Sequence, residues 1–142
     1  MRDAQLTYRG TVYPWHCDHM GHMNVMWYVG KFDEATWQFF TLLGLTPAVL
    51  RAQQRGMAAV EQTIQYKREL HAGDVVSIHS ELLAVGDKSL RFRHDMIDQA
   101  DGELAATTTL VGVHLDTVAR RACALPATVA TAARRLLAIS LR

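Results

Sequence analysis

The sequence predicts an α+β fold in which an antiparallel sheet wraps around one long, buried helix. From about residue 24 to residue 43, apolar side chains occupy nearly every direction of a helical wheel, so a helix there needs cover on most sides. Four later segments have the composition of strands and are bounded by turn-forming residues. Helix and strands do not alternate along the chain, and this order separates the pattern from the α/β class.

The first strand and the long helix have clear boundary residues. Residues 6–14, LTYRGTVYP, are rich in strand-forming types, and Pro14 ends the segment. Asn24 is a good N-cap residue for the helix, and Gly44 suits the left-handed conformation that often follows a helix. Residues 47–56 then form a connector with one or two helical turns.

The segment MAAVEQTIQYKREL alternates in the way expected of a half-buried strand. Its apolar face consists of Val60, Ile64, Tyr66 and Leu70. Its polar face, which includes Glu61, is expected to point away from the core.

Three further strands follow, separated by the turns HAGD, GDKS and QADG. They cover residues 74–85, 89–98 and 103–117. We therefore expect four strands that meander in succession and, with the first strand, a five-stranded antiparallel sheet. Pro126 suits the start of a terminal helix from about residue 127.

Length and composition fit a single domain that spans residues 1–142. A chain of 142 residues can bury roughly 70% of the surface that its unfolded form exposes. Fifteen basic and fourteen acidic side chains give a formal charge of +1. No basic run suits a phosphate backbone, so we expect no nucleic-acid partner.

The sequence gives no sign of export or of a membrane partner. Its start, MRDAQLTYRG, lacks the apolar core of a signal peptide. No segment offers the roughly 18 uninterrupted apolar residues of a membrane span. We expect a cytoplasmic protein in which Cys17 and Cys123 are free thiols, because a reducing compartment disfavours disulfides.

The stretch WHCDHMGHMN, residues 15–24, places reactive side chains directly before the long helix. Unpaired N–H groups and the positive end of the helix dipole face this loop and can stabilise an oxyanion. Asp18 can act on a nearby carbonyl as a nucleophile, or as a general base for water. Gly21 lets the backbone turn sharply or approach a ligand.

Each of these residues also has a simpler interpretation. Asp18 fits a turn-capping role, and the aromatic residues around the loop fit a core. His16, His19 and His22 recur every third residue, but no second ligand pair and no HExxH motif accompany them. We therefore expect no metal and no organic cofactor.

The pattern DHMGHMNVMWY at residues 18–28, followed by FDEAT at residues 32–36, resembles the opening of hot-dog fold thioesterases of the 4-hydroxybenzoyl-CoA thioesterase type. Later segments, including EQTIQYKREL, GDKSLRF and DGELAATTTLVGVHLD, resemble strands of the same family. The resemblance implies a hot-dog fold and hydrolysis of an acyl-CoA thioester in a site shared between two subunits. Because open sheet edges also invite pairing, we expect a homodimer or homotetramer.

The resemblance also assigns roles within the loop. Asp18 matches the catalytic carboxylate of the family, and the helix amides after Gly21 match its carbonyl-polarising element. His22 and Asn24 match positions near the site. The substrate-binding residues expected on this basis are Trp15, Gly21, His22, Asn24, Val25, Trp27 and Tyr28.

A closer resemblance is to betainyl-CoA thioesterases of carnitine catabolism. It rests on W-x-x-D-x-x-G-H-M-N, on F-D-E-A-T and on A-A-T with the later H-x-D at residues 105–116. It implies an acyl group with a quaternary ammonium, a cation that aromatic faces bind. We hypothesise that one or two of Trp15, Trp27 and Trp37 face the acyl pocket.

Two other functions are compatible with the same fold. A non-catalytic acyl-CoA-binding or sensing protein is the main alternative, since one fold hosts both roles. A hydratase or dehydratase ranks lower, because its resemblance would rest on a different helix motif. The carboxylate at Asp18 favours the enzyme, because a protein that only binds needs no carboxylate beside a thioester carbonyl.

Overall fold

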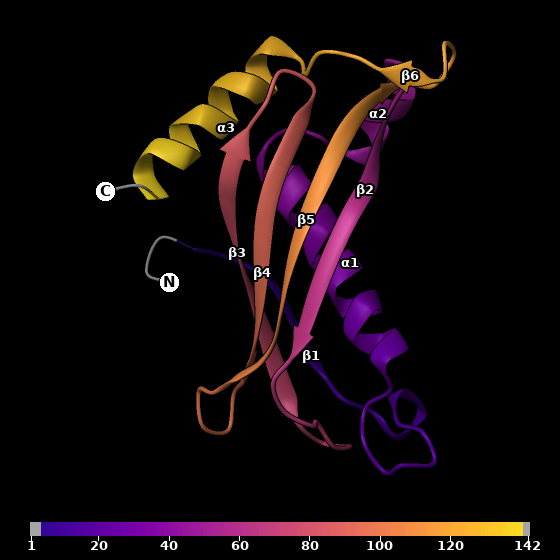
Figure 1. Ribbon diagram of the computed structural model, residues 1–142, viewed down its shortest axis with the longest axis vertical. Helices are drawn as coiled ribbons and strands as arrows, with labels where there is room; N and C mark the ends of the chain where they lie inside the picture. The colour runs from indigo at the N-terminus through magenta and orange to yellow at the C-terminus, as the bar shows by residue number, and fades with distance from the viewer. Residues whose placement is uncertain (1–3, 141–142) are drawn as a thin grey trace.

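A computed structural model describes residues 4–140 of the chain; residues 1–3, part of the segment assessed above for a signal peptide, and residues 141–142 lie outside the described range. The α+β prediction is confirmed (Figure 1). In chain order the elements are β1 (Gln5–Thr11), the 3-10 turn η1 (Pro14–His16), α1 (Val25–Leu42), α2 (Pro47–Ala52), β2 (Arg55–Tyr66), β3 (Val75–Val85), β4 (Ser89–Asp98), β5 (Leu104–Asp116), β6 (Arg121–Ala122) and α3 (Ala127–Ser140).

The strands form one antiparallel sheet with the order β1-β3-β4-β5-β2, and the short β6 pairs with β5. The sheet curls around α1, which runs behind it in Figure 1. Two expectations need correction. β2 pairs with β5 at the far edge instead of preceding β3 in a meander, and β6 is a sixth strand. Residues 67–74 therefore connect β2, at one edge of the sheet, with β3, which lies next to β1 at the other edge.

The predicted strand over residues 57–70 differs from β2 in two ways: β2 ends at Tyr66, so the buried Leu70 lies beyond the strand, and Val60 does not lie on its apolar face. A register shift between Ala59 and Glu61 places Val60 in a bulge, where its side chain is 62% exposed. A bulge adds one residue to the strand, so the residue within it does not follow the alternation of its neighbours. Beyond the bulge the predicted alternation holds: Gln62 lies on the same face as Ile64, and its amide donates a hydrogen bond to the Thr108 hydroxyl at 3.2 Å.

The boundaries of α1 agree with the sequence. The Asn24 side chain accepts a hydrogen bond from the Met26 N–H at 2.9 Å, so Asn24 is the N-cap. After the helix, Gly44 has a φ of +90°, a conformation that few residues other than glycine adopt. The predicted terminal helix is also present, as α3.

A buried chain of hydrogen bonds fastens the middle of α1 to the sheet. The Thr36 hydroxyl donates to the Phe32 carbonyl, so it can only accept from His94 Nε2, which lies 2.8 Å away. His94 Nδ1 then accepts from the Ser80 hydroxyl at 2.5 Å, and the Ser80 hydroxyl lies 2.7 Å from the hydroxyl of Thr7, which also donates to the Ile78 carbonyl. Burial lowers the pKa of His94 to about 3 and keeps the ring neutral, as this arrangement requires.

The helix α3 covers a part of β3 that no strand covers. β1 pairs only with Val75–Ser80, the first half of β3. α3 packs beside the other end of β3 (Figure 1), where Val129 and Ala133 join a core cluster that includes Leu82. The helix therefore shields a strand edge that would otherwise be open.

Candidate active site

Asp18 is held in place by the residues that begin α1. Its Oδ2 accepts a hydrogen bond from the Asn24 amide at 2.7 Å, and its Oδ1 accepts from the Met20 N–H at 2.9 Å. The bond from Asn24, followed by the bond from Met20, lowers the pKa of Asp18 below its usual value. The side chain is partly exposed and remains a carboxylate at neutral pH.

Gly21 makes the turn that brings Asp18 back toward the helix. Its φ is +86°, and its N–H donates to the Asp18 carbonyl at 3.0 Å. The Asp18 N–H in turn donates to the His22 carbonyl at 3.2 Å. A glycine is needed here because a side chain would strain the left-handed backbone.

The first N–H group of α1 is free. The Asn24 N–H donates to the His16 carbonyl, and the Met26 N–H donates to the Asn24 side chain. Within residues 4–140, no acceptor faces the Val25 N–H. This donor lies at the positive end of the helix dipole, beside the Asn24 that holds Asp18. Such a group can polarise a carbonyl oxygen.

A pocket of about 300 Å³ lies next to this loop, between α1 and the end of β2. We call it the tyrosine pocket; its lining residues are His22, Met23, Val25, Tyr28, Tyr66, Lys67, Arg68 and Glu69. The rings of Tyr28 and Tyr66 meet edge to face, with centroids 5.2 Å apart. The Tyr28 hydroxyl donates to the Arg68 carbonyl at 3.0 Å, and burial raises the pKa of Tyr28 to about 12.

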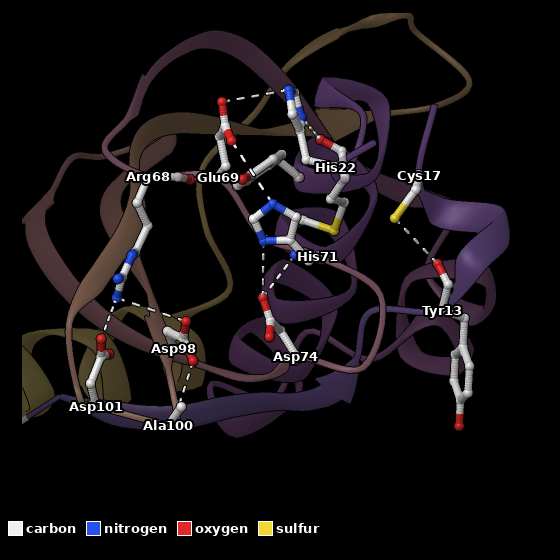
Figure 2. Close-up of polar contacts among 12 residues, drawn as sticks. Tyr13, Cys17, His22, Arg68, Glu69, His71, Asp74, Asp98, Ala100 and Asp101 are labelled. Atoms are coloured by element: carbon white, nitrogen blue, oxygen red, sulfur yellow. Dashed lines mark hydrogen bonds and ion pairs between the residues drawn. The ribbon is translucent and has the colours of Figure 1, made fainter. Parts of the chain in front are cut away.

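Charged and titratable groups gather at the rim of the tyrosine pocket. Figure 2 shows Glu69 between His22 and His71. One Glu69 oxygen lies 3.7 Å from His22 Nε2 and the other 3.9 Å from His71 Nε2. His71 also approaches Asp74, at 4.0 Å. The rim therefore offers carboxylates that a cationic group can approach.

The sequence-predicted residues divide into two groups. His22, Val25 and Tyr28 line the tyrosine pocket, and Asp18, Gly21 and Asn24 form the adjoining loop. The tryptophans lie elsewhere: Trp15 is 66% exposed and stacks on Tyr13, Trp27 packs on His16, and Trp37 packs on Phe40 in the core. Within the described residues, none of them lines the tyrosine pocket.

Sequence reasoning did not single out Tyr66 and Glu69, which line the tyrosine pocket. Tyr66 ends β2, and Glu69 lies in the segment that follows. The Met23 N–H donates to the Leu70 carbonyl at 2.7 Å, and this bond holds the segment after β2 against the loop that precedes α1. Alternation placed Tyr66 correctly on the inner face of β2, opposite Ala106. Only the strand order shows that this end of β2 reaches the start of α1.

Three further observations concern possible metal ligands, the cysteines and membrane-spanning segments. The part of the chain that the structure describes contains no group of three His, Cys, Asp or Glu side chains arranged to hold a metal. Cys17 and Cys123 are free thiols. Between residues 4 and 140, no helix combines the length and the apolar character needed to cross a membrane.

Comparison with known proteins identifies the family. The sequence profile of the thioesterase-like superfamily matches residues 12–133, and the chain belongs to this superfamily. The chain is 34% identical over 109 residues to an L-carnitine dehydrogenase/betainyl-CoA thioesterase of Agrobacterium fabrum, a match that covers 77% of the chain and 22% of the relative. It is 28% identical over 103 residues to Protein THEM6 of Danio rerio, covering 72% and 50%. The chain thus spans half or less of the length of these curated relatives.

Solved structures agree with the fold. A gentisyl-coenzyme A thioesterase is 29% identical, with a TM-score of 0.79 and coverage of 88% of this chain and 97% of that one. A hypothetical protein from Staphylococcus aureus, solved in complex with CoA, has a TM-score of 0.89 at 24% identity and covers 95% and 85%. The resemblance to hot-dog thioesterases inferred from the sequence is confirmed.

Proposed function

We propose that this protein hydrolyses acyl-CoA thioesters to a free acid and CoA. The observation that carries the proposal is the Asp18 carboxylate, held by Asn24 and Met20 beside the free Val25 N–H at the start of α1. These groups supply a base or nucleophile and an oxyanion donor within one short loop. Membership of the thioesterase-like superfamily supports the same reaction class.

The proposed reaction assigns one task to each group. The thioester oxygen accepts the Val25 N–H, so charge that develops on it is stabilised at the helix terminus. Asp18 removes a proton from water as the water attacks the carbonyl carbon, or it attacks directly and forms an anhydride that water opens. In both routes the carbon–sulfur bond breaks, and the departing CoA sulfur takes up a proton.

Asn24 orients the carboxylate in this scheme. Its amide donates to Asp18, while its side-chain oxygen caps the helix, so one residue fixes both the carboxylate and the oxyanion donor. The lowered pKa of Asp18 keeps it deprotonated, as either route requires. His22 forms the wall between this loop and the tyrosine pocket.

For the acyl group, we propose a cationic substrate of the betainyl type, bound in the tyrosine pocket. The faces of Tyr28 and Tyr66 offer a cation–π surface, and Glu69 adds a carboxylate at the rim. The relative of Agrobacterium fabrum, whose printed name includes betainyl-CoA thioesterase, supports this choice. Tyr66 and Glu69 take the role that the sequence suggested for the tryptophans.

A homodimer through the edge of β2 is part of the proposal, with a homotetramer as the larger form. Val60 and Tyr66 on β2 and Val25 and Met26 on α1 are all exposed. A second copy paired along β2 would cover these side chains beside the tyrosine pocket. Sedimentation of wild type and of Val60→Lys tests this arrangement, and a monomeric wild type would contradict it.

A cytoplasmic location remains a sequence-based proposal, testable by cell fractionation.

The central experiment measures release of CoA thiol from a panel of thioesters. The panel contains betainyl-CoA, its neutral isostere 3,3-dimethylbutanoyl-CoA, and long-chain and aryl acyl-CoAs, each with wild type and Asp18→Asn. We expect release that collapses in the variant while binding of the ester survives. Binding without release by wild type would favour a non-catalytic acyl-CoA-binding or sensing protein. Equal rates with betainyl-CoA and its neutral isostere would contradict the cationic substrate.

A further inference from the structure

A second pocket lies on the opposite flank of α1, between the helix and β1. It has a volume of about 430 Å³. We call it the β1 pocket; its lining residues are Tyr8, Gly10, Thr11, Tyr13, His16, Trp27, Lys31 and Glu34. None of these residues lines the tyrosine pocket.

Lys31 brings a buried positive charge to this pocket. Its side chain is only 3% exposed, and Nζ donates to the Tyr8 hydroxyl at 3.0 Å and to the Thr11 carbonyl at 3.4 Å. Among the described residues, no carboxylate oxygen lies within 4.0 Å of Nζ. A buried ammonium is costly without a counter-charge. One N–H of Lys31 therefore remains available for an anion.

The shape of β1 is adapted to this lysine. A Cβ atom on Gly10 would lie 2.2 Å from the Tyr8 hydroxyl oxygen. Because Gly10 has no Cβ, the Tyr8 ring can lie along the strand, with its centroid 5.3 Å from Lys31 Nζ and its hydroxyl within hydrogen-bond distance. The site is built jointly by β1 and α1.

His16 adds a second donor. The ring is 9% exposed, and its Nδ1 accepts the Tyr13 N–H at 3.0 Å, so the neutral ring carries its proton on Nε2. Burial, followed by the charge of Lys31, lowers the pKa of His16 and keeps the ring neutral. Across residues 4–140, no group accepts from Nε2.

The remaining walls attract a cation. The aromatic side chains of Tyr13 and Trp27 line the pocket, and aromatic rings bind cations. Contacts with Trp15 at 4.6 Å and with His16 at 4.4 Å hold these two rings in place. Glu34 is exposed and lines the same pocket. The charges of Lys31 and Glu34 cancel, which favours a ligand without net charge that still carries both signs.

We propose that the β1 pocket binds a small zwitterion with a carboxylate and a substituted ammonium group. The carboxylate accepts from Lys31 Nζ and His16 Nε2, and the ammonium group faces the aromatic walls and Glu34. A simple carboxylate would be repelled by Glu34, and a simple ammonium would leave Lys31 unpaired. The proposal is independent of the proposed hydrolysis, because it uses neither Asp18 nor the tyrosine pocket.

The test compares three ligands of nearly the same shape on the full chain. Glycine betaine carries both charges, 3,3-dimethylbutanoate lacks the cation, and choline lacks the carboxylate. Titration calorimetry gives the affinities, and NMR shifts of assigned backbone and tryptophan signals give the location. We expect glycine betaine to bind at least about fivefold more tightly than either analogue, with shifts at Trp27 and His16.

Two variants test the contributions of the Lys31 ammonium and the Glu34 carboxylate separately. Lys31→Met keeps the length of the side chain and should weaken glycine betaine by at least about tenfold. Glu34→Gln should weaken glycine betaine and strengthen 3,3-dimethylbutanoate, a change of opposite sign for the two ligands. Lys88→Met and Asp33→Asn remove matched charges outside the pocket and should leave both affinities unchanged.

Several results would overturn the proposal. These are the absence of saturable binding, shifts confined to Tyr66 and Glu69, or equal affinity for choline and glycine betaine. An unchanged affinity in Lys31→Met would also overturn it. If Lys31→Met fails to fold, as judged by its NMR spectrum, Glu34→Gln alone decides, because a change of the same sign for both ligands contradicts the proposal.

Discussion

Asp18 and His94 are both titratable groups joined by hydrogen bonds to α1 or its cap, but their surroundings are opposite. Asp18 is partly exposed, and the bonds from Asn24 and Met20 lower its pKa, so they hold it charged. His94 is fully buried between Thr36 and Ser80, and burial lowers its pKa to about 3, so it stays neutral. Hydrogen bonds at the solvent boundary preserve a reactive charge, whereas those in the core fix a neutral group that aligns the helix.

The largest expected effect separates the two groups by function. Asp18→Asn should lower thioester turnover by about 10² to 10⁴ fold. It should change the stability of the fold far less than it changes turnover, because the side chain lies at the surface and Asn keeps an oxygen that can accept from the Met20 N–H. Thiol release and urea unfolding of the same preparation measure both quantities. His19→Gln, at an exposed neighbour, is the control, and a turnover loss of similar size there would contradict the assignment.

The next effect concerns stability as a function of pH. Above pH 6.5, His94 is neutral in both the folded and the unfolded chain. Below that value His94 binds a proton in the unfolded chain, whereas in the folded chain it stays neutral until about pH 3. Unfolding therefore becomes easier as the pH falls, by up to about 1.4 kcal/mol per pH unit from this residue. Urea unfolding of wild type and His94→Gln between pH 7.5 and pH 4.5 tests this. Parallel curves would contradict it.

A smaller effect is expected when the partner of His94 is changed. Thr36→Val keeps the shape of the side chain but leaves the Nε2–H of His94 without an acceptor, at a cost of about 1 to 3 kcal/mol. Thr36→Ser retains the hydroxyl and should cost less. Chemical denaturation ranks the two variants, and a Val variant as stable as wild type would show that the chain of hydrogen bonds contributes little.

The smallest expected effect links the cap to the carboxylate. Asn24→Ala removes the N-cap, at a cost of about 0.5 to 2 kcal/mol. It also removes the bond that lowers the pKa of Asp18, so activity should be lost at a higher pH on acidification. Asn24→Ser keeps the capping oxygen and should restore stability but not the acid limb of kcat/KM. An unchanged acid limb in both variants would contradict the coupling.

Sequence signals that act over a few residues predicted the structure well. Asn24 caps α1, Gly44 follows it with a positive φ, and α3 begins directly after Pro126. Each depends on backbone chemistry within a turn of the chain, which the residue type largely determines. The loop from Asp18 to Asn24 was found for the same reason.

Long-range pairing was less predictable. Alternation could not reveal the bulge at Val60, because a bulge is defined by the partner strand. Nor could it place β2 beside β5, and so the proximity of Tyr66 and Glu69 to the start of α1 stayed hidden. The tryptophans are close in sequence, but successive helical positions point in different directions, so Trp27 and Trp37 lie in different surroundings.

The cover that α3 provides for β3 limits how the sheet can grow. At one end of the sheet, β2 leaves a long edge unpaired; at the other, β1 presents a short outer edge of seven residues, and α3 covers the half of β3 that β1 leaves unpaired. Removal of residues 127–140 would expose that half of β3 as well. Such a chain would present more unpaired backbone at this end of the sheet, which favours open-ended association of copies.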